Sequence, residues 1–451
     1  MNTIFISCFF NLVVRNLLET NFFKRIKDRP GLKIILLVPE KNADFFQKEF
    51  GGLSMIIERI PFRPLSKINL LFHVWSWNLL NTKSKKIHRL VELGKRRNYL
   101  NYFFNSFIAW TGSFSLVRKI FRFLDYYLIP GGGFKQLFEK YRPDLVFATD
   151  LQDLRAQEFS DSYLVREAKR HNIPTIGMGR SWDSTTTKGL LRTLPDKVIV
   201  QNSNIKLWTI QYHNVSESDI EVVGIPHYDD YLAGKRSDRN EFMRRIGLDP
   251  ERKYIFVTPP SDIWTGDKSF NNFLFQELAK LNEQVVIRFP LFGDLETGGF
   301  QLPKGMVFDI PKNASKLEES MLRRSDDRHL ADLIYHSAAV LTSPSSIVLD
   351  AAIFDKPTVL IGFDGKKSKP FWDSLLRYYE YEHQQEVIKA GNLKIAKSPE
   401  EMRELLKLYL ENPGIDREAR KRVAEGACFK LDGKSGQRLA NLLWNTLLRK
   451  K

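Results

Sequence analysis

The sequence predicts an α/β protein built from two doubly wound, parallel-sheet domains. Its 451 residues are many for one hydrophobic core and suit two domains. Short apolar runs alternate with segments of helical periodicity, and this alternation begins twice, at Thr3 and again at Tyr254. Between Ser337 and Asp364 the pattern is buried strand, hydroxyl-rich loop, short helix and buried strand. A crossover of this kind joins two parallel strands with a right-handed connection.

The first domain is predicted over residues 1–225. Its strands are apolar runs rich in β-branched and aromatic residues, as expected where helices cover both faces of a sheet. They are predicted at Thr3–Phe10, Lys33–Val38, Ser54–Ile57, Asp144–Thr149, Pro174–Met178, Asp196–Gln201 and Glu221–Val223, with a first helix over Asn11–Ile26. The apolar start of the chain lacks the basic residues that open a signal peptide, so we expect the first strand there instead.

A helical insertion is predicted at about residues 61–140 of this domain. Between Pro61 and Leu124, aromatic residues are interleaved with twelve basic ones, and Glu92 is the only acidic residue. Such a stretch can lie on an anionic membrane surface. The alternative is an insertion that packs its aromatic side chains inward and leaves its lysines in water. Nucleic acid is disfavoured as a partner because no recognised binding module accompanies the charge.

The second domain is predicted over residues 254–430, after a hydrophilic, helical connector at residues 226–253. Its strands are predicted at Tyr254–Thr258, Gln284–Phe289, Val307–Ile310, Ala338–Leu341 and Thr358–Gly362, with a short edge strand at Glu386–Ile388. Residues 431–451 hold a last amphipathic helix.

The charge, the cysteines and the apolar runs of the chain limit the kinds of protein that it can be. The net charge of +16 favours acidic partners, such as nucleotides or anionic lipid. The two cysteines, Cys8 and Cys428, lie far apart in sequence, which indicates a reduced compartment and no disulfide framework. The sequence contains no run of about 18 apolar residues, so no membrane-spanning helix is predicted. We also expect no obligatory metal, because the sequence has no D-x-D triplet.

The crossover between Ser337 and Asp364 is the best candidate for a ligand site. In its loop, Ser343 is predicted as the N-cap and Pro344 as the first helical residue. Unpaired N–H groups at the helix start, together with the loop hydroxyls, make a seat for phosphate. Asp350, two turns into the helix, is placed to accept a hydrogen bond from a ribose hydroxyl. The alternative is a well-capped crossover in the core that binds nothing.

This segment, TSPSSIVLDAAIFDKPTVLIGFD, resembles the donor-side segment of the CDP-glycerol glycerophosphotransferases, whose pattern is roughly T-D-x-S-S-x-x-x-D-x-x-x-x-x-K-P. Ser343 stands where the family usually has Asp. The matching residues are Thr342, Ser345, Ser346, Asp350, Lys356 and Pro357, and a second match is Asp432-Gly433-Lys434-Ser435. The resemblance implies the GT-B architecture, in which two Rossmann-like domains face each other across a cleft and the last helix often returns to the first domain.

The donor site is expected beyond the carboxyl ends of the second domain's strands, where ligands bind in open α/β sheets. The predicted nucleotide-binding residues are Pro260, Ser261, Arg288, Asp309, Ile310, Thr342, Ser343, Ser345, Ser346 and Asp350. Arg288 is the candidate cation for the diphosphate, because a guanidinium is a fork-shaped donor. The alternative for Arg288 is a solvated arginine at a strand end.

The acceptor side is expected in the first-domain loop Gly179–Gly189, GRSWDSTTTKG. Asp183 is the candidate general base on an acceptor hydroxyl, and Arg180 and Lys188 are candidates for steadying leaving-group charge. The alternative is a capped turn in which Asp183 bonds its own backbone. The resembling family carries a His-Gly pair where this chain has Gly179-Arg180, and a histidine where it has Phe289.

We therefore expect a transferase that moves a glycosyl group from a UDP- or CDP-linked donor to a surface-polysaccharide or lipid-linked acceptor. No cofactor is expected beyond the donor substrate, and the expected location is cytoplasmic, peripheral at the inner face of the plasma membrane. The alternatives are glycerophosphate transfer from CDP-glycerol, nucleotide-sugar epimerisation on the same fold, and an inactive GT-B binding scaffold.

Overall fold

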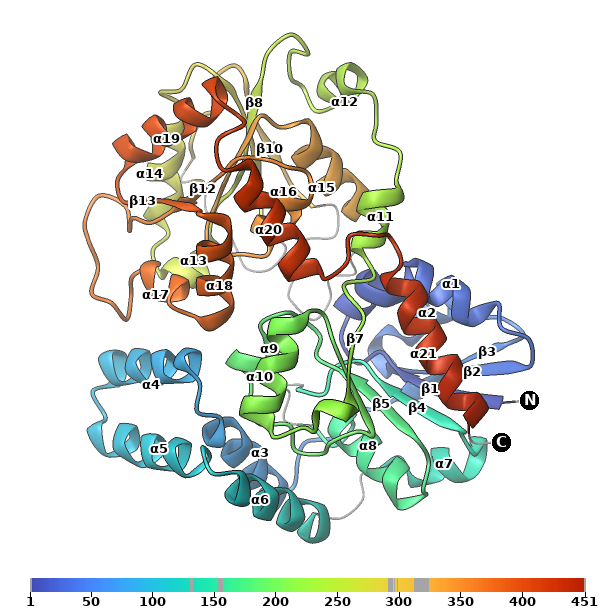
Figure 1. The fold of residues 1–451 in the computed structure, drawn as a ribbon. Helices are drawn as coiled ribbons and strands as arrows, with labels where there is room; N and C mark the ends of the chain where they lie inside the picture. The colour runs from blue at the N-terminus through green and yellow to red at the C-terminus, as the bar shows by residue number, and fades with distance from the viewer. Residues whose placement is uncertain are drawn as a thin grey trace. The chain divides into compact units, whose positions relative to one another are not determined.

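The computed structural model describes residues 2–129, 133–152, 157–290, 295, 297, 299–311 and 324–449. The chain divides into two compact units. The first unit comprises residues 1–89, 97–230 and 429–451, and the second comprises residues 90–96 and 231–428. Each unit is built around one parallel sheet (Figure 1).

The sheet of the first unit has seven strands in the order β3-β2-β1-β4-β5-β6-β7, all paired in parallel. The strands are β1 (Asn2–Ser7), β2 (Leu32–Pro39), β3 (Met55–Ile60), β4 (Leu145–Ala148), β5 (Thr175–Met178), β6 (Lys197–Val200) and β7 (Ile220–Val222). The order reverses between β1 and β4, as in doubly wound folds, and every predicted strand of this domain is present.

Helices cover both faces of this sheet. They include α1 (Asn21–Lys27), α2 (Ala43–Phe50), α7 (Lys135–Tyr141), α8 (Asp161–Arg170), α9 (Ser184–Thr187) and α10 (Ser203–His213), with short turns η1 (Val14–Leu18), η2 (Glu40–Asn42) and η3 (Glu217–Asp219). The single helix predicted over Asn11–Ile26 is wrong. Thr20 breaks it, because its hydroxyl accepts from the backbone N–H of Phe22 at 3.3 Å and starts α1 afresh.

The predicted insertion forms four helices, α3 (Lys67–Leu79), α4 (Lys83–Arg96), α5 (Tyr99–Thr111) and α6 (Ser115–Leu128). Its aromatic side chains do not all pack inward. Phe103, Phe107 and Trp110 on α5 are each more than half exposed. By contrast, Lys85 and Arg118 are buried, although the sequence places them among the basic residues of the insertion.

The second sheet has six parallel strands in the order β10-β9-β8-β11-β12-β13, with its reversal between β8 and β11. The strands are β8 (Tyr254–Thr258), β9 (Gln284–Arg288), β10 (Met306–Asp309), β11 (Ala339–Thr342), β12 (Thr358–Ile361) and β13 (Lys394–Ala396). Two buried apolar clusters line the two faces of this sheet. The two sheets therefore repeat one topology.

The helices of the second unit are α11 (Tyr228–Ala233, which begins in the first unit), α12 (Arg239–Arg245), α13 (Asp262–Thr265), α14 (Ser269–Leu278), α15 (Arg324–His336), α16 (Ile347–Ile353), α17 (Leu376–Tyr379), α18 (Glu382–Gly391), α19 (Pro399–Glu411) and α20 (Arg417–Cys428). The edge strand predicted at Glu386–Ile388 is wrong. These residues belong to α18, which buries His383, Val387 and Gly391 on one helical face. The edge strand is β13, a few residues later.

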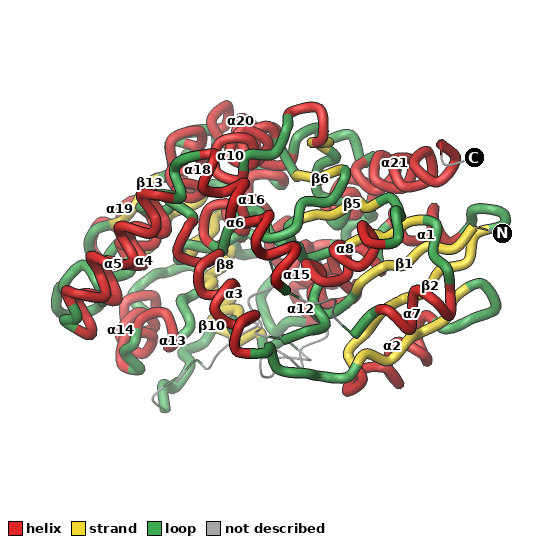
Figure 2. Tube along the Cα trace, turned by 90° about the horizontal axis from the view of Figure 1, so that it is seen from below, coloured by secondary structure: helices red, strands yellow, loops and turns green. Residues whose placement is uncertain are grey.

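The last helix, α21 (Ser435–Arg449), belongs to the first unit and runs alongside α1 (Figure 2). Gly436 permits this close packing, since a Cβ there would lie 2.6 Å from the backbone nitrogen of Phe22. The carboxylate of Asp229 accepts from the backbone N–H groups of Ser435 and Gly436 at 3.0 and 2.8 Å. A protein carboxylate thus occupies the start of α21.

Among the described residues, no helix combines the length and the apolar character needed to cross a membrane.

Candidate functional site

The hydroxyl-rich loop of the second unit lies at the reversal of strand order, between β8 and β11. The hydroxyl of Thr258, at the end of β8, donates to the Thr342 hydroxyl at 2.6 Å, and that hydroxyl lies 3.0 Å from the Ser345 hydroxyl. Ser346 is exposed and Ser345 is half-buried. The loop therefore offers hydroxyl groups to solvent at the carboxyl edge of the sheet, where ligands bind in this type of fold.

The start of the following helix differs from the prediction. Helix α16 begins at Ile347, and Ser346 is its N-cap with no capping hydrogen bond from its side chain. Ser343 is buried in the loop, where its backbone N–H donates to the Thr258 carbonyl at 3.3 Å. The predicted N-cap at Ser343 and helical Pro344 are therefore wrong. The backbone of Ser343 continues the pairing of β11 with β8 and is therefore not at the helix start. The hydroxyl that accepts from a backbone N–H of α16 is that of Ser345, which accepts from Ile347 at 3.3 Å.

Pro260 and Ser261 follow β8 and have structural contacts. The Asn271 amide donates to the Pro260 carbonyl at 2.9 Å. The buried Ser261 caps α13 by accepting from the backbone N–H of Ile263 at 3.4 Å. These residues thus fix the backbone of the loop that borders Thr342.

Arg288 and Asp309 end the neighbouring strands β9 and β10 and form an ion pair. The imidazole of His329, on α15, lies 2.7 Å from the other oxygen of Asp309. Burial alone opposes ionisation of this carboxyl, but the hydrogen bond from His329 and the charge of Arg288 outweigh it, so the pKa of Asp309 lies below its ordinary value. The cluster brings together a guanidinium, a carboxylate and an imidazole. The next residue, Ile310, is exposed.

Asp350 is buried in α16 rather than displayed at the surface. Burial first, and the nearby charge of Asp350 second, raise the pKa of the Cys428 thiol. Because the carboxylate lies under α20, a role toward a ribose hydroxyl requires that a ligand reach it from the loop side of α16.

In the first unit, the loop after β5 folds into the short helix α9 with a dense set of internal hydrogen bonds. The carboxylate of Asp183 accepts from the hydroxyls of Ser181 and Thr187, the latter at 2.9 Å. The ammonium of Lys188 is buried and donates to the Ser184 hydroxyl at 3.0 Å. Ser181 and Ser184 are themselves 3.0 Å apart, so one chain of polar contacts links Asp183 with Lys188.

Arg180 lies at the reversal point of the first sheet. Its guanidinium is 3.0 Å from the carboxylate of Asp150, which follows β4, and lies over the ring of Phe10, which follows β1, at 3.7 Å from the ring centroid. Asn11 and Arg15 follow the same strand, and Arg15 lies 3.3 Å from the imidazole of His227. The loops after β1, β4 and β5 thus converge at one edge.

The predicted site residues form distinct groups rather than one. In the second unit, the hydroxyl loop and the Arg288 cluster lie on opposite sides of β8 in the strand order. Sequence reasoning missed His329, because this residue belongs to a helix and meets Asp309 only through the fold. Within the described residues, no group of three or more His, Cys, Asp or Glu side chains is arranged to hold a metal ion.

A model of the family described as CDP-glycerol:poly(glycerophosphate) glycerophosphotransferase matches residues 175–445. The chain belongs to this family. The match includes the hydroxyl loop, the Arg288 cluster and the start of α21, and it identifies the protein as a transferase of the nucleotide-linked class. No curated protein matches the chain.

Solved structures similar to this family member share its whole architecture at low sequence identity. The UDP-GlcNAc 2-epimerase from Methanocaldococcus jannaschii has 11% identity and a TM-score of 0.54, covering 98% of this chain and 99% of that one. The enzyme from Neisseria meningitidis bound to UDP-GlcNAc has 12% identity and a TM-score of 0.56, with 99% and 100% covered. The calicheamicin glycosyltransferase CalG4 has 13% identity and a TM-score of 0.53, with 100% and 99% covered. The predicted GT-B fold class is thereby confirmed.

Proposed function

We propose that this protein transfers a glycosyl group from a UDP- or CDP-linked donor to a hydroxyl of a surface-polysaccharide or lipid-linked acceptor. The accessible hydroxyl loop at the strand reversal of the second unit is the observation that carries the proposal. A nucleoside diphosphate needs oriented N–H and O–H donors near a cation, and this loop supplies such donors at the edge where Rossmann-like sheets bind nucleotides.

In this reaction the acceptor oxygen forms a bond to the anomeric carbon, and the bond from that carbon to the diphosphate oxygen breaks. The nucleoside diphosphate leaves, and the acceptor proton passes to a base. Asp183 is the proposed base, with Arg180 and Lys188 opposing the developing negative charge. The donor residues are those predicted from the sequence, from Pro260 to Asp350, and His329 joins them through Asp309.

Glycerophosphate transfer from a CDP-linked donor is the second candidate, and the family match favours it. In that reaction the acceptor oxygen attacks phosphorus and the leaving group is a nucleoside monophosphate. Glycosyl transfer is preferred because neither family histidine is present, since Gly179-Arg180 and Phe289 occupy those positions. Epimerisation and an inactive scaffold are the remaining alternatives.

The released nucleotide separates these reactions. The purified protein is incubated with CDP-glycerol or UDP-sugars and with lipid vesicles carrying an acceptor, and the nucleotide product is identified. Nucleoside diphosphate supports glycosyl transfer, monophosphate supports glycerophosphate transfer, and an altered free sugar nucleotide without release supports epimerisation. No turnover, together with no thermal stabilisation by CDP or UDP, overturns the transferase proposal.

A substitution tests the donor seat itself. Ser346→Tyr places a bulky ring at an exposed position of the loop, so we expect it to abolish stabilisation by nucleotide with little effect on folding. Ser216→Tyr is the matched control, because Ser216 is also an exposed helix-capping serine but lies in the first unit. Equal nucleotide stabilisation of both variants would place the donor elsewhere.

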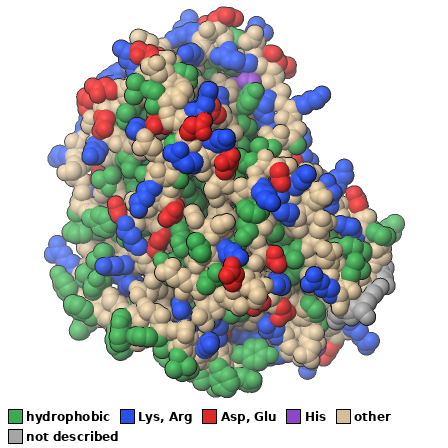
Figure 3. All heavy atoms as spheres, viewed as in Figure 1, with side chains coloured by type: hydrophobic (Ala, Val, Ile, Leu, Met, Phe, Trp, Pro, Cys, Tyr) green, Lys and Arg blue, Asp and Glu red, His purple; other side chains and the backbone are tan. Residues whose placement is uncertain are grey.

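The insertion supports a peripheral membrane location for the acceptor reaction. Large apolar side chains are exposed along α3, α5 and α6, and Figure 3 shows hydrophobic side chains gathered over this part of the molecule. The exposed basic side chains in the same segment of the sequence are Arg63, Lys67, Lys83, Lys86, Lys95, Arg96, Arg97 and Lys119. Apolar and basic groups side by side are typical of helices that lie in an anionic membrane surface.

A further inference from the structure

An exposed tryptophan lies near the carboxyl edge of the second sheet. Trp264 belongs to α13, the short helix that follows β8 after Pro260 and Ser261. It is 53% exposed, and its neighbour Ile263 is 73% exposed. Single exposed apolar side chains are common on protein surfaces, so exposure alone assigns no role to this pair. The position of Trp264 and the contacts that hold it distinguish it from such side chains.

The topology places the segment that carries Trp264 next to the hydroxyl loop. Strand β11 lies between β8 and β12 in the sheet, about 4.8 Å from each. The segment after β8 and the segment after β12, residues 362–375, therefore flank the hydroxyl loop on its two sides. All three segments follow the carboxyl ends of their strands, where ligands bind in this type of fold.

Two basic side chains join the flanking segments to each other. The guanidinium of Arg377, on α17, donates to the carbonyl of Trp264 at 3.1 Å. The ammonium of Lys369 donates to the carbonyl of Thr265 at 3.1 Å and pairs with Asp267 at 3.2 Å. Figure 1 shows α13 and α17 next to each other in the second unit. The segments after β8 and β12 thus hold each other in place.

The same contacts hold the indole ring of Trp264 in one orientation. The rings of Trp264 and Tyr378 are nearly perpendicular, at 86°, with their centroids 5.3 Å apart. Tyr378 is itself fixed, because the guanidinium of Arg377 lies 4.3 Å from the centroid of its ring and donates to its hydroxyl at 2.8 Å. A ring that is already held in this way loses little conformational entropy when a ligand packs on it.

Arg377 also brings a positive charge to this part of the sheet edge. Its side chain is buried, and its partners are the carbonyls of Ser374 and Trp264 and the hydroxyl of Tyr378. Among the residues that the structure describes, no carboxylate pairs with it. Burial makes an uncompensated charge costly, so an anion nearby is favoured. An exposed aromatic ring close to a buried cation suits a ligand in which an apolar face is joined to a phosphate.

We propose that Trp264 binds the transferred group of the donor, and that this group is a sugar ring rather than glycerol. This inference rests on the proposed transferase function and narrows its substrate. A pyranose carries C–H groups on a rigid face, and these pack on an indole ring while the hydroxyls stay at the rim of the sugar. Glycerol has no such face, and its rotatable bonds would have to be immobilised to cover the same area.

Isothermal titration calorimetry measures what the transferred group adds to nucleotide binding. Of glucose, galactose and N-acetylglucosamine linked to UDP or CDP, at least one should bind at least tenfold tighter than the free nucleoside diphosphate. CDP-glycerol should bind no tighter than CDP. Trp264→Ala should remove the gain from the sugar and leave the affinity for the free diphosphate within twofold, because Arg377 bonds the backbone carbonyl of this residue and not its ring.

Two further variants serve as controls. Trp264→Phe should retain most of the gain, since it keeps a flat ring. Leu408→Ala should bind as the unmodified chain does, because Leu408 is exposed on α19 near the opposite edge of the sheet, where Lys253, just before β8, donates to the Leu410 carbonyl. A sugar gain that survives in Trp264→Ala, with the fold verified by circular dichroism, overturns the assignment of Trp264. A gain from glycerol equal to that from a sugar overturns the choice of a sugar.

The assignment of Trp264 and the transferase can fail separately. Binding of UDP or CDP without any gain from a sugar overturns the role of Trp264 alone. Sugar-nucleotide binding that depends on Trp264, with the sugar epimerised and not transferred, supports the role of Trp264 and overturns the transferase. No binding of any nucleotide by the unmodified chain overturns the transferase, and this inference falls with it.

Discussion

At the scale of single residues, Arg118 and Arg288 are both buried basic side chains, and they differ in the partners that hold them. Arg118 donates to the carbonyls of Gln211 and Tyr212 at 3.0 and 2.8 Å, so this basic residue of the insertion anchors α6 to α10. Arg288 has a carboxylate partner and an imidazole nearby at a strand end. The sequence alone does not distinguish Arg118 from Arg288, because the partners of each come from elements that are distant in the sequence.

Lys85 gives a prediction at this scale. Its side chain is buried, its ammonium nitrogen lies 3.0 Å from the centroid of the Trp77 ring, and it has no hydrogen-bond partner among the described residues. Burial first, and the charge of Arg89 second, hold the pKa of Lys85 well below its ordinary value. Between that lowered pKa and about 10.4, the unfolded chain binds a proton that the folded chain lacks.

Stability should therefore rise with pH in this window, by up to about 1.4 kcal/mol per pH unit from this group. Lys85→Met removes the titration, so we expect the variant to be more stable than the parent at pH 7 and its advantage to shrink by pH 9. Urea unfolding at both pH values measures this. Lys86→Met, at the exposed neighbouring position, should show no such trend. An advantage for Lys85→Met that stays constant with pH would contradict a neutral buried amine.

At the scale of elements, the strands were predictable and the helix starts were less so. Continuous apolar runs predict buried strands because both faces are covered, and every predicted strand except Glu386–Ile388 is present. That run failed because Val387 also fits one helical face, together with His383 and Gly391, and three residues cannot distinguish the two periods. Ser343 failed as an N-cap because the β11 pairing extends into its backbone.

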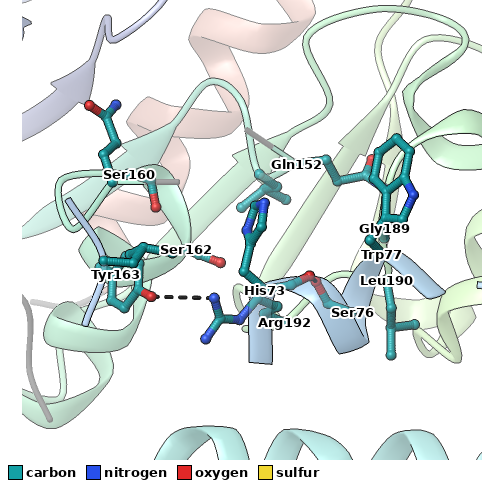
Figure 4. Close-up of a pocket in the computed structure, with 13 residues that line it drawn as sticks. His73, Ser76, Trp77, Gln152, Ser160, Ser162, Tyr163, Gly189, Leu190 and Arg192 are labelled. Atoms are coloured by element: carbon teal, nitrogen blue, oxygen red, sulfur yellow. Dashed lines mark hydrogen bonds between the residues drawn. The ribbon is translucent and has the colours of Figure 1, made fainter. Parts of the chain in front are cut away.

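The candidate sites show the same limit. The hydroxyl loop was found because its residues are contiguous in sequence. A polar pocket in the first unit (Figure 4) was not found, because its lining comes from α3, the loop after β4, α8 and the segment before β6. No local pattern joins Trp77, Gln152 and Arg192, and only the sheet topology brings them together.

The insertion gives the prediction that belongs to this scale. Phe103 and Phe107 lie one turn apart on α5 and are 66% and 59% exposed. If this face inserts into an anionic membrane surface, Phe103→Ser with Phe107→Ser should reduce flotation with phosphatidylglycerol-containing vesicles at least tenfold, since each ring loses its apolar burial. Leu207→Ser is the control, because Leu207 on α10 is equally exposed outside the insertion. Flotation that the double variant retains would rule out this face.

At the scale of the whole molecule, the first unit is completed by the end of the chain. The second unit ends at Cys428, and residues 429–451 return to the first unit as α21. Leu439 and Leu443 on α21 are fully buried, and α21 packs on α1. The first unit is therefore one compact body made from segments that are discontinuous in sequence. For this reason, the position of a mutation in the sequence does not by itself show which unit the mutation affects.

Two unfolding transitions are expected, one for each core, and CDP or UDP should raise the one that belongs to the second unit. Leu443→Ala should lower the nucleotide-insensitive transition, by about 2–5 kcal/mol for a buried leucine. Leu406→Ala, fully buried on α19 in the second unit, should lower the other by a similar amount. Differential scanning calorimetry with and without nucleotide measures both. Leu443 follows the whole second unit in sequence. If Leu443→Ala lowers only the nucleotide-insensitive transition, then α21 stabilises the first unit alone. A shift of both transitions by Leu443→Ala, or one transition for the whole chain, would contradict two independent cores.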